Sequence, residues 1–147
     1  MAENGKRRKR LKTEVGGSGA FQKNFMIFCV GALGYGGMEI AFRGYTHWTM
    51  LLTGGVVFSL LYRIQIHMGE KPLWLRCVVG TAVITAAEFI VGCIVNLWLG
   101  WNVWDYSAFH VQLLGQVCLV FSALWFLLCG PVFYTAKMME QGWRKRH

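Results

Sequence analysis

The feature that most constrains this chain is an apolar run from Leu73 to Leu99 with one acid, Glu88, near its middle. A helix needs about 20 apolar residues to cross the ~30 Å hydrocarbon core of a bilayer. The run is therefore long enough to span a membrane. A charged side chain inside a membrane costs roughly 2.5 to 3.5 kcal/mol on insertion scales and usually marks a functional position. Glu88 is therefore the first candidate for a functional residue.

The composition is that of a membrane protein rather than a soluble domain. Hydrophobic residues make up 55% of the chain, the mean hydropathy is +0.40, and 15% of residues are charged, whereas soluble domains average about 25%. The net charge of +8 comes mainly from basic clusters in the two tails, at 6–12 and 144–146. Because these charges flank apolar runs, they indicate membrane orientation, and we expect no nucleic-acid partner.

The five cysteines all lie inside apolar runs, and none stands at C-x-x-C spacing. No histidine stands at metal-ligand spacing either. This pattern predicts packing residues rather than a disulfide framework or a metal site, and we expect no cofactor. The sequence also lacks the P-loop, zinc-protease and serine-hydrolase motifs, so nothing in it indicates an enzyme.

Four apolar runs predict an all-α fold, a polytopic membrane bundle of four transmembrane helices surrounded by lipid. The expected spans are 25–42, 48–66, 73–99 and 113–134. Fourteen Lys and Arg residues lie in the tails and the middle loop, whereas Arg43 alone lies in the outer links. This bias predicts a multi-pass protein of the cell membrane with both termini in the cytoplasm. The expected parts are a basic tail at 1–22, flexible over 1–19, a transmembrane domain at 23–136 and a basic tail at 137–147.

Two similar segments suggest an internal repeat. Two segments share one pattern: Gly36-Gly37-Met38-Glu39 and Thr85-Ala86-Ala87-Glu88. Each places two small or polar residues and then one apolar residue before an acid, about fifteen residues into a span. Each of these spans is followed by one that returns across the membrane. Two parallel helical hairpins with acids at similar depth are therefore one arrangement that the pattern allows.

Polar residues form a stripe on two of the expected helices. The first stripe contains Ala32, Tyr35, Gly36, Glu39 and Arg43, and the second contains Thr81, Thr85, Glu88, Gly92 and Asn96. Residues at these spacings share one helix face. One interpretation places both acids in a central polar cavity that binds a cation, a proton or a polar group. The other is structural: Glu39 pairs with Arg43, and Glu88 is hydrogen-bonded to a neighbouring helix.

The segment after the third span, Trp104-Asp105-Tyr106-Ser107, also has two interpretations. Asp105 or Ser107 caps a short helix while the aromatic residues lie at the membrane interface, or Asp105 lines an outer entrance. The candidate substrate-binding or ion-binding residues from the whole chain are Glu39, Arg43, Glu88, Asn96, Trp104 and Asp105.

Several segments together resemble a known family. They are Gly34-Tyr35 to Glu39, Phe42 to Met50, Glu88-Phe89, Gly92-Cys93, Asn96-Leu97-Trp98, Trp104 to Ser107, and Gly115-Gln116-Val117-Cys118 to Leu124-Trp125-Phe126. Over about residues 25 to 130 the chain is similar to the CmpB-like family named "putative ABC-transporter type IV", whose members are small integral membrane proteins. The resemblance implies transport, and it marks Glu39, Arg43, Glu88, Trp104 and Asp105 as characteristic positions.

Three functions remain open at this point. The first is a transporter permease component that moves a small polar or ionic solute through a cavity containing the intramembrane glutamates. It could act as a homodimer or with a separate ATPase or other membrane subunit. The second is a scaffold or regulatory subunit that transports nothing and uses its small-residue faces to bind partner helices. The third is a membrane enzyme that modifies lipids.

Overall fold

The computed structural model describes residues 2–146, with their side chains from residue 17 onward. The chain forms four long helices, a short π-helical segment and a small hairpin. In chain order the elements are α1 (Ala2–Arg43), α2 (Trp48–His67), α3 (Leu73–Gly92), η1 (Cys93–Trp98), β1 (Gln112–Leu113), β2 (Val117–Cys118) and α4 (Leu119–Arg146). The two strands pair antiparallel, with Gln112 opposite Cys118.

Four helical stretches are long and apolar enough to cross a membrane, which confirms the expected all-α membrane bundle. They are Gly17–Arg43, Trp48–His67, Leu73–Trp98 and Leu119–Arg146. Large apolar side chains such as Phe25, Leu33, Trp74 and Leu127 are exposed on their outer faces. Because lipid tails are as apolar as these side chains, such a surface is suited to a bilayer rather than to water.

The first helix is longer than the sequence predicts. Residues 2–19, expected to be a flexible tail, continue α1 without a break, and the side chains of residues 1–16 lie outside the described part. No proline interrupts the chain before Pro72, and Lys, Arg, Leu and Glu all favour helix. The basic tail at the other end likewise continues α4 as far as Arg146.

The fourth span begins later than expected. The sequence predicts a start near 113, but residues 112–118 form the hairpin and α4 starts at Leu119. Leu114 and Gly115 both adopt a left-handed conformation, with φ of 52° and 68°, and this conformation stops a right-handed helix. The third span matches its expected length, but its last six residues are π-helical.

Glycines allow α1 and α2 to pack closely. A Cβ atom added at Gly31 would lie 2.6 Å from the carbonyl oxygen of Gly54, and one at Gly54 would lie 2.9 Å from that of Gly31. Either distance is too short for a real contact, so both positions need a residue without a side chain. The remaining core joins α2, α3 and α4 through residues such as Leu61, Cys129 and Phe133.

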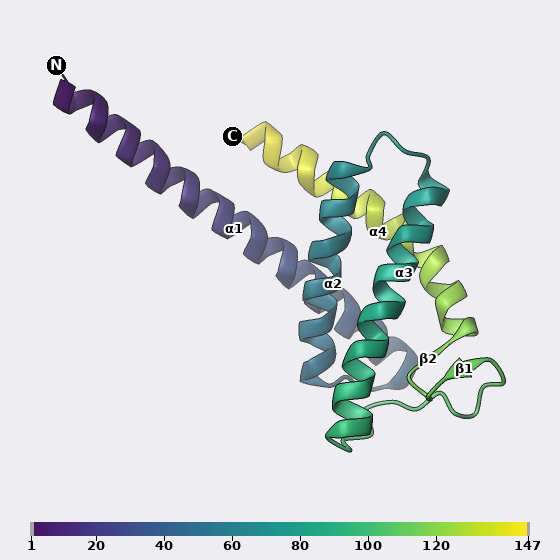
Figure 1. The fold of residues 1–147 in the computed structure, drawn as a ribbon. Coiled ribbons are helices and arrows are strands. Elements are labelled where there is room, and N and C mark those ends of the chain that lie inside the picture. The colour runs from purple at the N-terminus through teal and green to yellow at the C-terminus, as the bar shows by residue number, and fades with distance from the viewer. Residues whose placement is uncertain (1, 147) are drawn as a thin grey trace.

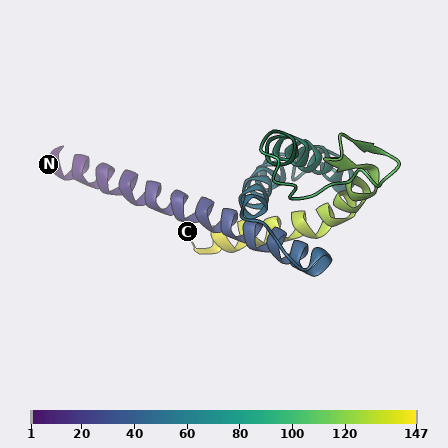
Figure 2. The same ribbon diagram turned by 90° about the horizontal axis from the view of Figure 1, so that it is seen from below.

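The first and last helices run side by side in opposite directions, and α2 and α3 lie in front of them in the view of Figure 1 and above them in Figure 2. The link at 44–47 and the hairpin lie at the end of the bundle opposite the termini, which we call the outer end. Glu39 lies one turn before the end of α1. Glu88 is followed by the last turn of α3 and all six residues of η1. Because η1 extends beyond the end of α1 at the outer end (Figure 1), the equal depth of the two acids that the repeat suggested stays a prediction.

Candidate functional site

Glu39 is buried at the outer end of α1, where two donors meet its carboxylate. Arg43 donates from Nη1 at 3.0 Å and Thr46 donates from Oγ1 at 2.6 Å. Gly44, with φ of 79°, ends the helix and allows the chain to bring Thr46 back toward Glu39. Only 8% of Glu39 is exposed, and the guanidinium and hydroxyl together satisfy both of its oxygens.

Arg43 connects this acid to the loop that follows η1. Its Nη2 donates to the carbonyl oxygen of Val103 at 2.6 Å and to the Tyr45 hydroxyl at 3.2 Å. The guanidinium carries five N–H donors, and three hydrogen bonds within the protein are formed. Further N–H groups of Arg43 therefore remain for other ligands.

Glu88 is buried on α3 and accepts hydrogen bonds from a pair of aromatic side chains. Its Oε1 accepts from the Tyr35 hydroxyl at 3.1 Å, and its Oε2 accepts from Trp125 Nε1 at 3.0 Å. The two rings come from α1 and α4 and are stacked with centroids 5.6 Å apart. Glu88 is 4% exposed. A single carboxylate on α3 thus holds together the first and last helices.

These contacts agree with the structural interpretation of both acids, since each carboxylate oxygen has a donor. They are also compatible with a binding role, because a carboxylate that fixes the position of neighbouring side chains determines the shape of any cavity that those side chains line. Within residues 17–146, no group of three His, Cys, Asp or Glu side chains could hold a metal ion. The chemistry available at this site is hydrogen bonding and charge pairing.

An outer cavity of about 300 Å³ lies between α1, α4 and the loop at 104–109. Four of the six predicted site residues line it: Glu39, Arg43, Trp104 and Asp105. Aromatic and aliphatic side chains form most of the remaining wall. Glu88 does not line the cavity, but both rings that it holds, Tyr35 and Trp125, do.

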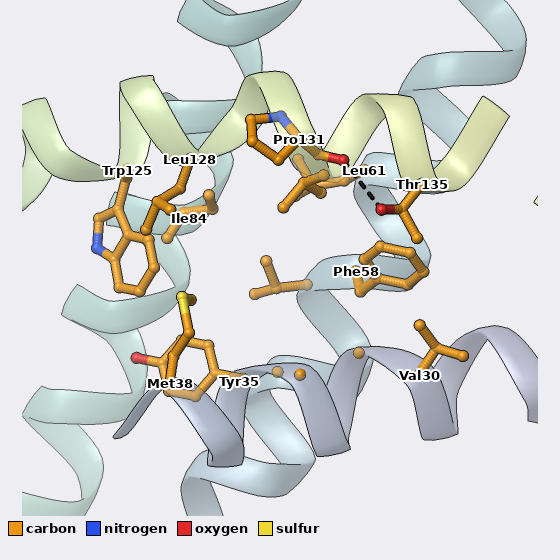
Figure 3. A pocket seen from close by; sticks show the side chains of 15 residues that line it. Val30, Tyr35, Met38, Phe58, Leu61, Ile84, Trp125, Leu128, Pro131 and Thr135 are labelled. Carbon is orange, nitrogen blue, oxygen red and sulfur yellow. Dashed lines mark hydrogen bonds between the residues drawn. The ribbon is translucent and has the colours of Figure 1, made fainter. Parts of the chain in front are cut away.

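An inner cavity of about 270 Å³ follows along the same helices toward the termini (Figure 3). Its wall is apolar, with Val30 and Tyr35 on α1 opposite Pro131 and Thr135 on α4. The inner and outer cavities have four lining residues in common: Tyr35, Met38, Trp125 and Leu128. The ring pair held by Glu88 therefore stands between them.

Asp105 lies at the surface, at the edge of the outer cavity. Its Oδ1 accepts hydrogen bonds from the Ser107 backbone N–H at 2.9 Å and the Ser107 hydroxyl at 2.5 Å. These bonds lower the pKa of the Asp105 carboxyl below its usual value. The neighbouring Tyr106 stays neutral, because burial raises the pKa of its phenol. The Asp105 carboxylate is thus a permanent negative charge that faces water.

The segment 104–107 forms a turn and not the start of a short helix, which corrects the capping interpretation. Gly115 explains the local shape, since a Cβ atom there would lie 2.6 Å from Asp105 Oδ1 and 2.8 Å from Ser107 Oγ. The carbonyl oxygen of Gly115 also accepts a hydrogen bond from the Tyr106 N–H at 2.7 Å. The β1–β2 turn and the 104–107 turn therefore depend on one another.

Asn96 does not line either cavity. Its amide donates to Gln116 Oε1 at 2.8 Å and accepts from the Val103 N–H at 2.7 Å. Trp104 is also tied to this network, because its indole N–H donates to the carbonyl oxygen of Gln116 at 2.9 Å. Asn96 and Gln116 thus position the loop whose side chains form the outer wall.

The partners that complete each cluster are not among the site residues predicted from the sequence. Trp125 is the main omission, although Ser122 lies three residues before it in the same span and Trp125 belongs to a segment that resembles the family. A Trp N–H in the bilayer core needs an acceptor, and Glu88 is an acid without a basic neighbour, so the two requirements together could have paired them. Thr46 and Gln116 lie in segments that resemble the family, but spacing along a helix does not pair them with Glu39 or Asn96, because each reaches its partner through a turn.

Comparison with protein families gives one match. A family model described as "Putative ABC-transporter type IV" matches residues 25–145, a range that overlaps all four apolar spans. Searches of curated proteins and of solved structures each found no match to this chain.

Proposed function

Because the chain belongs to the Putative ABC-transporter type IV family, we propose that it is the membrane-embedded component of a transporter whose outer cavity binds a small polar or ionic solute. The supporting observation is that Glu39, Arg43 and Asp105, three of the predicted site residues, line one cavity of about 300 Å³ at the outer end of the bundle. A cavity with a few polar groups on a mainly apolar wall is typical of small-molecule sites.

The charges at this cavity favour a solute with a polar group. Arg43 is paired with Glu39, so their charges cancel, and Arg43 still has N–H groups to donate. Asp105 adds an exposed carboxylate on the other side. The cavity can therefore present donors and an anionic acceptor to the same ligand.

In this proposal the stacked rings of Tyr35 and Trp125 form the inner boundary of the outer cavity. A solute that moves further inward must pass the rings, and Glu88 holds both of them. Glu88 is then a positioning residue, since it acts on the solute through the rings. Its removal should alter passage more strongly than binding at the outer end.

We further propose that a separate ATPase subunit supplies the energy, and that the termini face the cytoplasm where this subunit would bind. The sequence has no nucleotide-binding motif of its own. Most of its Lys and Arg residues lie in the tails and the middle loop, as expected for cytoplasmic segments.

Native membrane vesicles from cells with and without the protein provide the first test. They are incubated with ATP on the side that bears the termini and with a mixture of amino acids, sugars and inorganic ions, and the retained solutes are measured by mass spectrometry. We expect the protein to change the content of at least one solute, and Glu88→Gln to abolish that change. Glu70→Gln, the same substitution in the exposed α2–α3 link, should leave it intact.

Identical solute content with and without the protein would contradict the transport proposal, as would normal transport by Glu88→Gln. The partner is tested separately by purification from native membranes in mild detergent. An ATPase recovered in stoichiometric amount would support ATP coupling, whereas recovery of the protein alone would contradict it.

A further inference from the structure

The seam between α1 and α4 has properties that the transport of a small polar solute does not require. We propose that this seam binds one membrane phospholipid whose head group carries a phosphate and an amine, with an acyl chain in the inner cavity and the head group in the outer cavity. The inference rests on the proposed function, because it identifies the polar group in the outer cavity as part of a lipid.

The chemistry of the inner cavity favours a hydrocarbon ligand. The two side-chain hydroxyls in its wall already have acceptors: Thr135 donates to the carbonyl oxygen of Pro131 at 3.0 Å, and Tyr35 donates to Glu88. The rest of its wall is formed by apolar side chains and glycines. An apolar cavity of roughly 150 Å³ is large enough to bind benzene, so one of about 270 Å³ has room for several methylene groups.

The inner cavity opens sideways between the two helices. At the inner end α1 and α4 are joined by the Lys23–Glu140 ion pair at 2.7 Å. Between that pair and the stacked rings, the wall includes Gly34, which is exposed and has no atom within 4 Å of a Cβ placed there. Because both helices lie within apolar spans, this opening faces the acyl chains of the bilayer.

The two cavities can be occupied by a single molecule. They share four wall residues, and two of these, Met38 and Leu128, have flexible aliphatic side chains. Neither Met38 nor Leu128 takes part in the hydrogen bonds of Tyr35 and Trp125 to Glu88, so these two side chains can change rotamer to admit an acyl chain while those bonds are kept. A lipid whose acyl chain lies in the inner cavity can therefore place its head group in the outer cavity.

The charges of the outer cavity select the head group. Guanidinium groups bind phosphate well, and Arg43 lines this cavity with N–H groups to spare. Asp105 is an ionised carboxylate on the same wall, and it pairs with an ammonium group. Since Glu39 already neutralises Arg43, the remaining charge is negative, which disfavours a head group with net negative charge.

Native mass spectrometry of the full-length protein tests the proposal. The protein is purified in mild detergent and titrated separately with phosphatidylethanolamine and phosphatidylglycerol. We expect one phosphatidylethanolamine to bind about tenfold more tightly than phosphatidylglycerol, and Gly34→Leu, which fills the inner cavity, to weaken binding about tenfold. Gly37→Leu is the matched control: Gly37 is exposed on the same helix, has no atom near its Cβ and does not line the cavity.

A further variant tests the head group alone. Asp105→Asn keeps an oxygen that can accept the hydrogen bonds from Ser107 but removes the charge, so it should abolish the preference between the two lipids. Circular dichroism and thermal unfolding verify that each variant is folded. A preference unchanged in Asp105→Asn would overturn the assignment of the head group.

Three results would overturn the proposal as a whole: no lipid bound to the wild type, equal binding by Gly34→Leu and the wild type, or a protein dimer that Gly34→Leu disrupts. Lipid binding is measured at equilibrium without ATP or a partner subunit. Lipid binding can therefore be observed when no transport is seen in the vesicle assay, and transport can be seen when no lipid binds. The two proposals are thus tested independently.

Discussion

Replacing Glu88 should lower the free energy of unfolding, and the loss should increase with the number of hydrogen-bond acceptors removed. In Glu88→Ala the Tyr35 hydroxyl and the Trp125 N–H both lose their acceptor. Hydrogen bonds between membrane helices contribute about 0.6 kcal/mol on average and up to about 1.7 kcal/mol. Two of them predict a loss of roughly 1 to 3 kcal/mol in the free energy of unfolding. Glu88→Gln retains one carbonyl acceptor, so about half of that loss is expected.

The assay is unfolding in detergent micelles by sodium dodecyl sulfate, followed by far-ultraviolet circular dichroism. A double-mutant cycle between Tyr35→Phe and Glu88→Ala isolates the hydrogen bond, because Phe differs from Tyr only by the hydroxyl. We expect a coupling energy of about 0.6 to 1.7 kcal/mol. Tyr134→Phe is the control for the same chemical change on an exposed ring, and it should leave the stability unchanged.

Additivity in this cycle would refute the reasoning. If Tyr35→Phe and Glu88→Ala destabilise the protein independently, the hydroxyl does not depend on the carboxylate. Tyr35 would then be held against Trp125 by stacking alone, and Glu88 would fix only the Trp125 ring at the boundary between the cavities.

Three other predictions concern single positions. Gly31→Ala should lower the free energy of unfolding by about 1 to 3 kcal/mol relative to Gly34→Ala, because only the first places a Cβ against α2; equal unfolding curves would contradict this. Gly115→Ala should disturb the outer loop more than Gly100→Ala in amide exchange, because both have positive φ but only Gly115 is crowded; equal exchange would argue against the crowding. The hydrogen bonds from Ser107 lower the pKa of Asp105 on folding. Asp105 therefore stabilises the fold at pH values above the ordinary carboxyl pKa, and this stabilisation is lost as the pH falls through the lowered pKa. A titration midpoint for Asp105 at or above about 3.9, measured by nuclear magnetic resonance, would contradict this prediction.

Sequence analysis could predict the membrane bundle because the signal for a span is simple. Length and hydrophobicity decide whether a helix crosses a bilayer, and the boundaries of α2 and the start of α3 at Leu73 follow directly from the apolar runs. The start of α4 could not be predicted in this way. Residues 113–118 are as apolar as a span, and only the left-handed turn at Leu114 and Gly115 separates them from the helix.

The candidate site was predictable in part, for a different physical reason. Glu39 and Arg43 are one helical turn apart, so their pairing follows from spacing alone, whereas Trp125 reaches Glu88 only through the packing of α3 against α4. The sequence predicts Asn96 as a site residue since it shares a helix face with Glu88, yet the loop after η1 occupies that face and its Val103 N–H binds the Asn96 amide. A polar stripe shows that a face meets polar partners, but it does not distinguish a solute from the protein's own backbone.

The Lys23–Glu140 pair has a consequence for the order in which the molecule is made. Its partners are 117 residues apart in the chain, and ribosomes add about 5 to 20 residues per second. Glu140 is therefore added to the chain roughly 6 to 23 s after Lys23. The α1–α2 hairpin can close early, since Gly31 and Gly54 are both present by then. The seam with α4 is completed last, so the nascent protein exposes one side of α1 to the surrounding membrane until translation is almost finished.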